Sequence, residues 1–273
     1  RRGVLPRIRA AVKWFGRPAA TIAAVLALVF ASPLAAQAPN LDWRTLETQH
    51  FYIHFTPPIE GFARRVAADA ERAYGELSAE LHPPRGMIDV VVSDDYDFSN
   101  GSATPYPTNR IVIFANPPVF ESALRYTSDW GRLVITHELT HIFHLDRSRG
   151  IWAVGQHIFG RAAFLFPNLY SPSWLTEGLA VYEESKLTGV GRLEGSEHRM
   201  IARASAIDHV FPSIGRLSLA QGRYPFGETA YSFGSLFIDY VAKTRGEQHV
   251  RDFVEKSSAD IIPYLVDIPA RQG

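Results

Sequence analysis

The chain has 273 residues, of which 46% are hydrophobic and 21% charged, and its 28 basic residues balance 28 acidic ones. This is the composition of an ordinary globular protein with a sizeable core, so long disorder is excluded. The zero net charge comes without a basic stripe interleaved with aromatics, which gives no support for a nucleic-acid partner. The absence of cysteine excludes disulfides and thiolate metal ligands.

The first 38 residues differ in kind from the rest. Six of the 28 basic residues and none of the acidic ones lie here, followed by an apolar run from Ala19 to Ala31. Ala36-Gln37-Ala38 then supplies the small-x-small pattern of a signal-peptidase site. We therefore expect residues 1–38 to be a signal peptide and the mature protein to be exported, to the periplasm or outside the cell. The alternative is an uncleaved leader that anchors the protein in a membrane through residues 19–31.

After the leader, the expected strands come first and the helices second. Alternating apolar residues predict a strand over 50–55, and an Ala/Glu/Arg-rich stretch predicts a helix over 59–81. Further strands are expected over 87–92 and 110–115, separated by a loop over 93–108 with a turn at Asn100-Gly101. Beyond Pro118 the patterns predict helices over 130–147, 172–186, 194–207 and 248–257. A further long helix is expected to follow Tyr224-Pro225-Phe226-Gly227 and to end at Arg245.

This order predicts an α+β fold with two lobes and an active-site cleft between them. The N-terminal lobe, residues 39–125, is expected to be a mixed β-sheet with helices. The C-terminal lobe, residues 126–273, is expected to be mainly helical and to carry the functional site. The last residues, Arg271-Gln272-Gly273, show no clear sign of a domain boundary. A further C-terminal domain in a longer parent protein is therefore also expected as a possibility.

His137-Glu138-Leu139-Thr140-His141 is the most informative stretch of the chain. Residues i and i+4 of a helix project from the same face, so both imidazoles can bind one metal ion. Glu138 is offset by about 100° from His137, which places its carboxylate beside the metal rather than on it. A base that activates water belongs at that position. Thr127, Ser128 and Asp129 offer caps for the start of this helix.

Two histidines do not complete a catalytic zinc site, which usually has three protein ligands and an open position. The best third candidate is Glu177, because Gly178 follows it and permits close approach of a second helix. His144 is the alternative, since it shares a helix face with His137 and His141. Its imidazole would lie two turns from His137 along the axis, which favours core packing over a third metal bond.

The motif and the segment Trp174-Leu175-Thr176-Glu177-Gly178 together resemble the gluzincin metallopeptidases, the thermolysin and aminopeptidase N side of the zincin clan. The resemblance covers roughly residues 127–246. It implies a zincin-like fold, zinc bound by His137, His141 and Glu177, Glu138 as general base, and a peptide or protein substrate. Two departures stand out: 35 residues separate His141 from Glu177, about twice the usual gap, and no Gly-x-Met-Glu-Asn motif is present.

Tyr231-Ser232-Phe233-Gly234 is similar to the aminopeptidase segment whose tyrosine donates to the reaction's oxyanion. A phenol in that position supplies a few kcal/mol of transition-state stabilisation. Tyr224 is the alternative donor, and a buried core aromatic is the alternative role for Tyr231.

Two further expectations concern the surroundings of the site. The strand over 110–115 is expected to be the sheet edge along which an extended peptide pairs. The apolar segment 151–170 is expected to pack in the core, with a lid, a substrate wall or an interfacial membrane segment as alternatives. The sequence thus predicts an exported zinc metallopeptidase; its rivals are another zinc amide hydrolase, such as a cell-wall peptide amidase, and an inactive peptide-binding module of the same fold.

Overall fold

The structure is a computed structural model that describes residues 41–119, 124–125, 127–218, 222 and 224–262. From Asp42 onward, the described residues form one compact unit. The expected signal peptide and the expected anchor over 19–31 lie outside the described residues. Within the described part, no helix is both long and apolar enough to cross a membrane.

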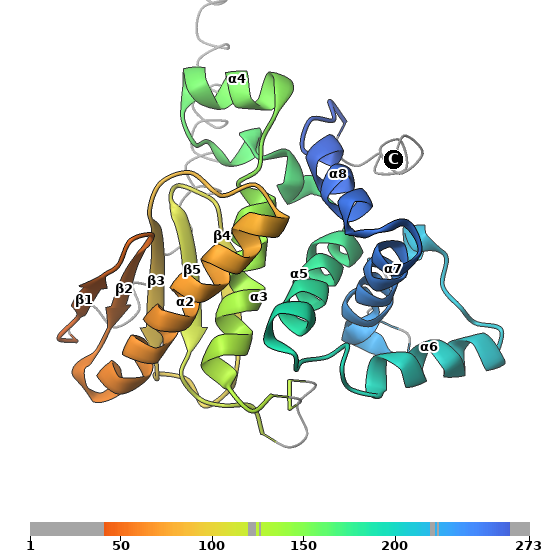
Figure 1. Cartoon of the computed structure of the whole chain (residues 1–273), viewed down its shortest axis with the longest axis horizontal. Coiled ribbons are helices and arrows are strands. Elements are labelled where there is room, and N and C mark those ends of the chain that lie inside the picture. The colour runs from red at the N-terminus through yellow and green to blue at the C-terminus, as the bar shows by residue number, and fades with distance from the viewer. Residues whose placement is uncertain (1–40, 120–123, 126, 219–221, 223, 263–273) are drawn as a thin grey trace, which may run out of the picture. The chain divides into compact units, whose positions relative to one another are not determined.

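A five-stranded mixed sheet forms the first half of this unit, in the order β1-β2-β3-β5-β4 (Figure 1). The three central strands run parallel to one another, and the outer strands β1 and β4 are antiparallel to their neighbours. The strands are β1 (Arg44–Glu47), β2 (Phe51–Phe55), β3 (Ile88–Ser93), β4 (Gly101–Thr104) and β5 (Asn109–Phe114). The predicted strands over 50–55, 87–92 and 110–115 are therefore present.

Two predictions about the sheet are wrong. The segment Gly101–Thr104, expected to be loop, forms strand β4 and pairs antiparallel with β5. Because β4 covers it, β5 is an inner strand, and β4 is the edge on that side. Strand β1 was not predicted. Three of its four side chains are exposed and the fourth is partly buried, so it lacks an alternating apolar pattern.

Helices α2 (Glu60–Glu80) and α3 (Trp130–Leu145) pack against the sheet and form its core. Small residues such as Ala63, Ala70 and Ala73 line the buried stripe of α2, which lets the helix lie close to the strands. Apart from Arg132, every residue of α3 is buried. The predicted cap is confirmed, because the Asp129 side chain accepts a hydrogen bond from the Arg132 amide at the start of α3.

The second half of the unit is helical, and the α+β class is confirmed. Its central pair is α5 with α7, beside α3 (Figure 1). Glycines with positive φ terminate both helices of this pair: Gly189 at +69° ends α5 and Gly246 at +95° ends α7. The helices are α4 (Gly150–Phe159), α5 (Ser173–Thr188), α6 (Glu197–Ile207), α7 (Thr229–Arg245) and α8 (Glu247–Ser257).

Helices α5 and α7 cross with their backbones in contact. A side chain added at Gly178 would place its Cβ 2.5 Å from the Gly234 carbonyl carbon, so neither position has room for a larger residue. The predicted role of Gly178 in close helix approach is confirmed. The crossing also fixes the positions of Glu177, directly before Gly178 on α5, and of Tyr231, three residues before Gly234 on α7.

The expectation that segment 151–170 packs in the core is wrong for most of its apolar residues. Only Leu165 and Phe166 of these are buried, while the large side chains of α4 and the segment after it face solvent. The exposed ones are Ile151, Val154, Ile158, Phe159, Phe164, Leu169 and Tyr170. The apolar run predicts burial but does not say which side of the helix faces inward.

Candidate metal centre

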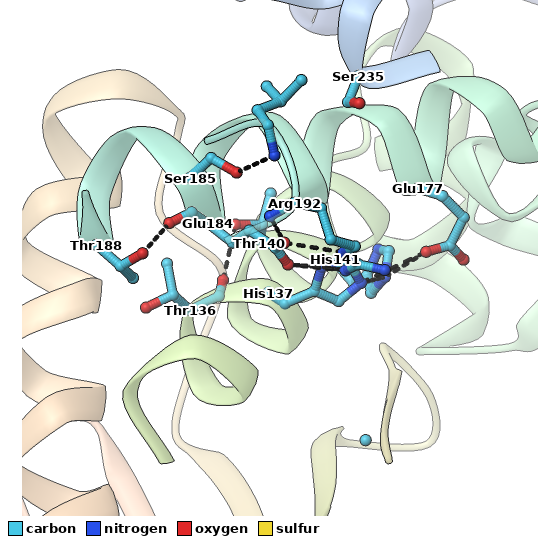
Figure 2. Close-up of polar contacts among 12 residues, drawn as sticks. Thr136, His137, Thr140, His141, Glu177, Glu184, Ser185, Thr188, Arg192 and Ser235 are labelled. Carbon is cyan, nitrogen blue, oxygen red and sulfur yellow. Dashed lines mark hydrogen bonds and ion pairs between the residues drawn. The ribbon is translucent and has the colours of Figure 1, made fainter. Parts of the chain in front are cut away.

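His137, His141 and Glu177 converge on one point (Figure 2). The two Nε2 atoms lie 3.2 Å apart, and Glu177 Oε2 lies 3.4 Å from each of them. Both histidines are buried, with 7% and 8% of their surface exposed. Residues from two helices, separated by 35 positions in the sequence, thus form a triangle of three nitrogen and oxygen donors.

The size of this triangle fits zinc. A tetrahedral ion with bonds of about 2.0–2.1 Å separates its ligand atoms by about 3.3–3.4 Å. The three observed separations agree with that value. Three protein donors of the His-His-Glu type also leave a fourth position for water or substrate. The chemistry of the donor set and its spacing therefore both fit a catalytic zinc ion.

Electrostatics at the triangle favours a cation. Burial alone would raise the pKa of Glu177, but the neighbouring His141 and His137 outweigh it and hold the pKa well below its usual range. Burial lowers the pKa of His137, yet its contacts with Glu177 and Glu184 outweigh burial and raise the pKa to about 9. Without a metal, a proton on His137 serves as the positive charge that the carboxylates require. A zinc ion would replace that proton.

Glu184 and Arg192, neither of them predicted from the sequence, form a second layer behind His137. Glu184 Oε2 lies 2.7 Å from His137 Nδ1, so Nδ1–H donates to this carboxylate when Nε2 faces the metal (Figure 2). Arg192 donates two hydrogen bonds to the same carboxylate, from Nε to Oε1 at 2.9 Å and from Nη2 to Oε2 at 2.8 Å. Glu184 lies seven residues after Glu177 on α5, the same-face spacing that could have identified it.

This second layer is fully buried and charged. The side chain of Glu184 is 0% exposed and that of Arg192 is 7% exposed. Burial raises the pKa of Glu184, but Arg192 and His137 outweigh it and lower the pKa to about 2. Glu184 is therefore ionised at neutral pH. Its fixed negative charge orients His137 and increases the basicity of Nε2 toward a metal.

Glu138, the predicted base, lies beside the triangle and lines the same cavity of about 490 Å³. It is 5% exposed, and burial raises the pKa of its carboxyl group. A raised pKa suits a group that must take up a proton near neutral pH. The structure thus places Glu138 where the sequence predicted it, next to the metal ligands and not among them.

Strand β4 packs closely against the Glu138 side chain at Gly101. A Cβ at Gly101 would lie 2.6 Å from Glu138 Oε1 and 2.8 Å from Val134 Cγ2, distances that side chains do not tolerate. Only glycine allows the edge strand to lie this close to the base. The sequence pattern predicts a turn at Asn100-Gly101 and gives no sign of this contact.

We expect Gly101→Ala to displace Glu138 and to lower kcat at least tenfold, since small misplacements of catalytic groups cost about that much or more. The metal ligands are not touched, so zinc content should stay unchanged. The matched control is Gly75→Ala on α2, where an added Cβ meets nothing within 4 Å. Steady-state kinetics and metal analysis on both variants check this; equal kcat values for the two would contradict it.

Tyr231 lines the metal cavity, whereas Tyr224 does not. Tyr224 is 56% exposed and lines a different cavity, with Phe211 and Pro225. The ring of Tyr231 is covered on one face by Arg192, whose Cζ lies 4.9 Å from the ring centroid. Burial, with a contribution from Glu177, raises the pKa of the Tyr231 phenol. The phenol therefore keeps its proton and remains a hydrogen-bond donor.

His144 is 1% exposed and lies outside the ligand triangle. Neither of its ring nitrogens has a hydrogen-bond partner among the described residues. Burial, with a contribution from His141, lowers the pKa of His144 to about 3, so the ring is neutral. Its packing agrees with the core role that the sequence favoured over a metal bond.

No family model matches this chain, and no curated protein does. Among solved structures, it is similar to leukotriene A4 hydrolase of Saccharomyces cerevisiae. Two structures of the native hydrolase align at 15% and 16% identity and TM-scores of 0.47 and 0.46, over 79% of this chain and 33% and 32% of the hydrolase. The hydrolase in complex with bestatin aligns at 15% identity and a TM-score of 0.49, over 85% and 36%. The chain thus spans about a third of the hydrolase.

Proposed function

We propose that this chain is an exported, zinc-dependent metallopeptidase of the gluzincin type. The observation that carries the proposal is the donor triangle of His137, His141 and Glu177, sized for a tetrahedral zinc, with Glu138 beside it in one open cavity. The expected leader over residues 1–38 supports export to the periplasm or beyond.

When bound, zinc would supply Lewis acidity, which polarises a substrate carbonyl and acidifies water. Glu138 would accept the proton of the attacking water on its carboxylate and pass it to the leaving amine. The phenol of Tyr231 would donate a hydrogen bond to the oxygen that gains charge during attack. Arg192 and Glu184 would hold His137 and the Tyr231 ring in place.

The substrate would lie along β4. Gly101, Ser102 and Ala103 line the metal cavity, and β4 is the outer strand of the described sheet on that side. An extended peptide can pair with the free edge of such a strand and present its carbonyl to the site. The expected substrate-binding edge therefore moves from β5 to β4, one strand nearer the metal ligands.

A quenched-fluorescence peptide library tests the proposal directly. The protein from residue 39 onward, loaded with zinc, should cleave at least one peptide class, and a chelator should abolish cleavage until zinc is restored. His137→Ala should lose both zinc and activity. Zinc binding without cleavage of any peptide would instead favour the inactive binding module, and cleavage that persists in His137→Ala would reject the proposed site.

For Tyr231→Phe, we expect kcat to fall by roughly 10- to 1000-fold with little change in KM, as when one oxyanion donor is lost. The ring and its packing against Arg192 remain, so folding and zinc content should be preserved. Tyr224→Phe is the matched control and should behave like the wild type. If only Tyr224→Phe lowers kcat, the donor is Tyr224 and the assignment fails.

A further inference from the structure

Helix α4 and the segment after it present an exposed apolar surface. Its side chains are 56% to 70% exposed and include no charged group. We call this the α4 surface; it consists of Ile151, Val154, Ile158, Phe159 and Phe164. Helix α4 itself, Gly150–Phe159, contains no aspartate, glutamate, lysine or arginine. Contiguous apolar patches of this kind mark interaction sites on soluble domains.

The helix is inverted relative to an ordinary surface helix. Its one buried residue is polar: Gln156 donates to Ser148 Oγ at 2.9 Å and to the Leu165 carbonyl at 2.8 Å, and accepts from Arg85. Ile151, Val154 and Ile158 face outward because the fold binds Gln156 on the other side of the helix. An ordinary amphipathic helix places its apolar stripe inward. The inversion indicates that the α4 surface meets an apolar environment other than the core.

The helix is held firmly in this orientation. The Trp152 indole Nε1 donates to the Asp260 carbonyl at 2.7 Å, and Gly155 rests against Leu165. Figure 1 shows α4 at the top of the view, above the strands. Ile261 and Ile262 directly follow Asp260, the residue that Trp152 contacts, and are 71% and 59% exposed. They add two exposed apolar side chains close to α4.

The ion pairs around α4 contain more arginines than carboxylates. The side chains of Arg85 and Arg149 are 54% and 46% exposed. Asp146, which pairs with Arg85 and Arg161, is 2% exposed. Glu255 is 30% exposed and pairs with two arginines, Arg147 and Arg149. This contrasts with residues 39–273 as a whole, which carry 22 basic against 28 acidic residues.

We propose that the α4 surface inserts into the interfacial region of a bilayer that contains anionic phospholipids. Apolar side chains would enter the boundary between head groups and acyl chains, and the guanidinium groups of Arg85 and Arg149 would meet the phosphates. A protein partner fits less well, because protein interfaces carry about one hydrogen bond per 100–200 Å² and His157 is the only polar side chain within helix α4 that is exposed.

Vesicle flotation tests this proposal with the protein from residue 39 onward, which lacks the leader and retains the whole compact unit. Vesicles of equal parts phosphatidylcholine and phosphatidylglycerol should carry the protein upward; vesicles of phosphatidylcholine alone should carry less. Ile158→Glu/Phe159→Glu should lower the partition coefficient at least tenfold, since it places two carboxylates in the apolar boundary. The matched control is Met200→Glu/Ile207→Glu on α6, with the same charge change at residues 53% and 76% exposed.

Retained binding in the control and loss in the α4 variant would support the proposal, and circular dichroism should show both variants folded. Equal binding of both variants, or no flotation of the wild type, would overturn it. A wild-type dimer in light scattering that the α4 variant abolishes, without lipid binding, would also overturn it and assign the surface to a second copy. Peptidase activity is not needed for any of these readouts.

Discussion

Replacing Glu138 by glutamine is expected to leave zinc bound and to lower kcat by about 10²- to 10⁴-fold, the usual contribution of a positioned base. The change keeps the shape of the side chain against Gly101 but removes its capacity to accept a proton. Because Glu138 is not one of the three converging donors, its loss should not reduce metal content. Steady-state kinetics together with metal analysis of the same preparation measures both effects.

Glu183→Gln is the matched control for this experiment. Glu183 is a buried glutamate on α5, 2% exposed, whose pKa burial raises to about 7. It lies outside the residues that line the metal cavity. The same chemical change there should leave kcat within a few-fold of the wild type. Turnover near wild type in Glu138→Gln would show that another group activates the water.

Arg192→Met is expected to be the most destabilising single change in the second layer. It leaves the Glu184 carboxylate buried without its guanidinium partner, which typically costs about 3–5 kcal/mol of unfolding free energy. Part of that loss should return in Arg192→Met/Glu184→Gln, because the side chain that lost its guanidinium partner is then neutral. Urea unfolding of the metal-free wild type, Arg192→Met, Glu184→Gln and the double variant measures four free energies of unfolding, from which the coupling between the two residues follows.

Arg251→Met provides the comparison for a half-exposed ion pair. Arg251 bonds Glu80 at 2.7 Å, with side chains 32% and 18% exposed, and such pairs contribute about 0–1 kcal/mol. If Arg192→Met costs no more than Arg251→Met, the buried pair does not stabilise the site as described. The double variant should also bind zinc more weakly, since Glu184 no longer orients His137 through a charged acceptor.

The three candidate metal ligands were predictable because each is indicated by residues close to it in the sequence. The spacing of His137 and His141 places both rings on one face of a helix, and Asp129 caps its start. Glu177 was predictable through its neighbour, since Gly178 signals the backbone contact that the crossing with Gly234 requires. In each case a single short segment contains the residue and the physical reason for its place.

The parts that sequence reasoning missed depend on distant contacts. Strand β4 has no alternating apolar pattern, and it is a strand because its backbone pairs with β5. The apolar segment 151–170 was expected to pack in the core, but the hydrogen bonds of Gln156 hold the polar side of α4 against the fold. Arg192 lies in a loop eight residues after Glu184, and only the folded chain brings its guanidinium onto that carboxylate.

The central claim is that one zinc ion binds among His137, His141 and Glu177. Diffraction data recorded on both sides of the zinc absorption edge, from crystals of the zinc-loaded protein, test it most directly. The account predicts one anomalous peak, about 2.0–2.1 Å from both Nε2 atoms and at similar distance from a Glu177 oxygen. A peak bound by His144 in place of Glu177, a peak elsewhere in the molecule, or no peak would contradict the account.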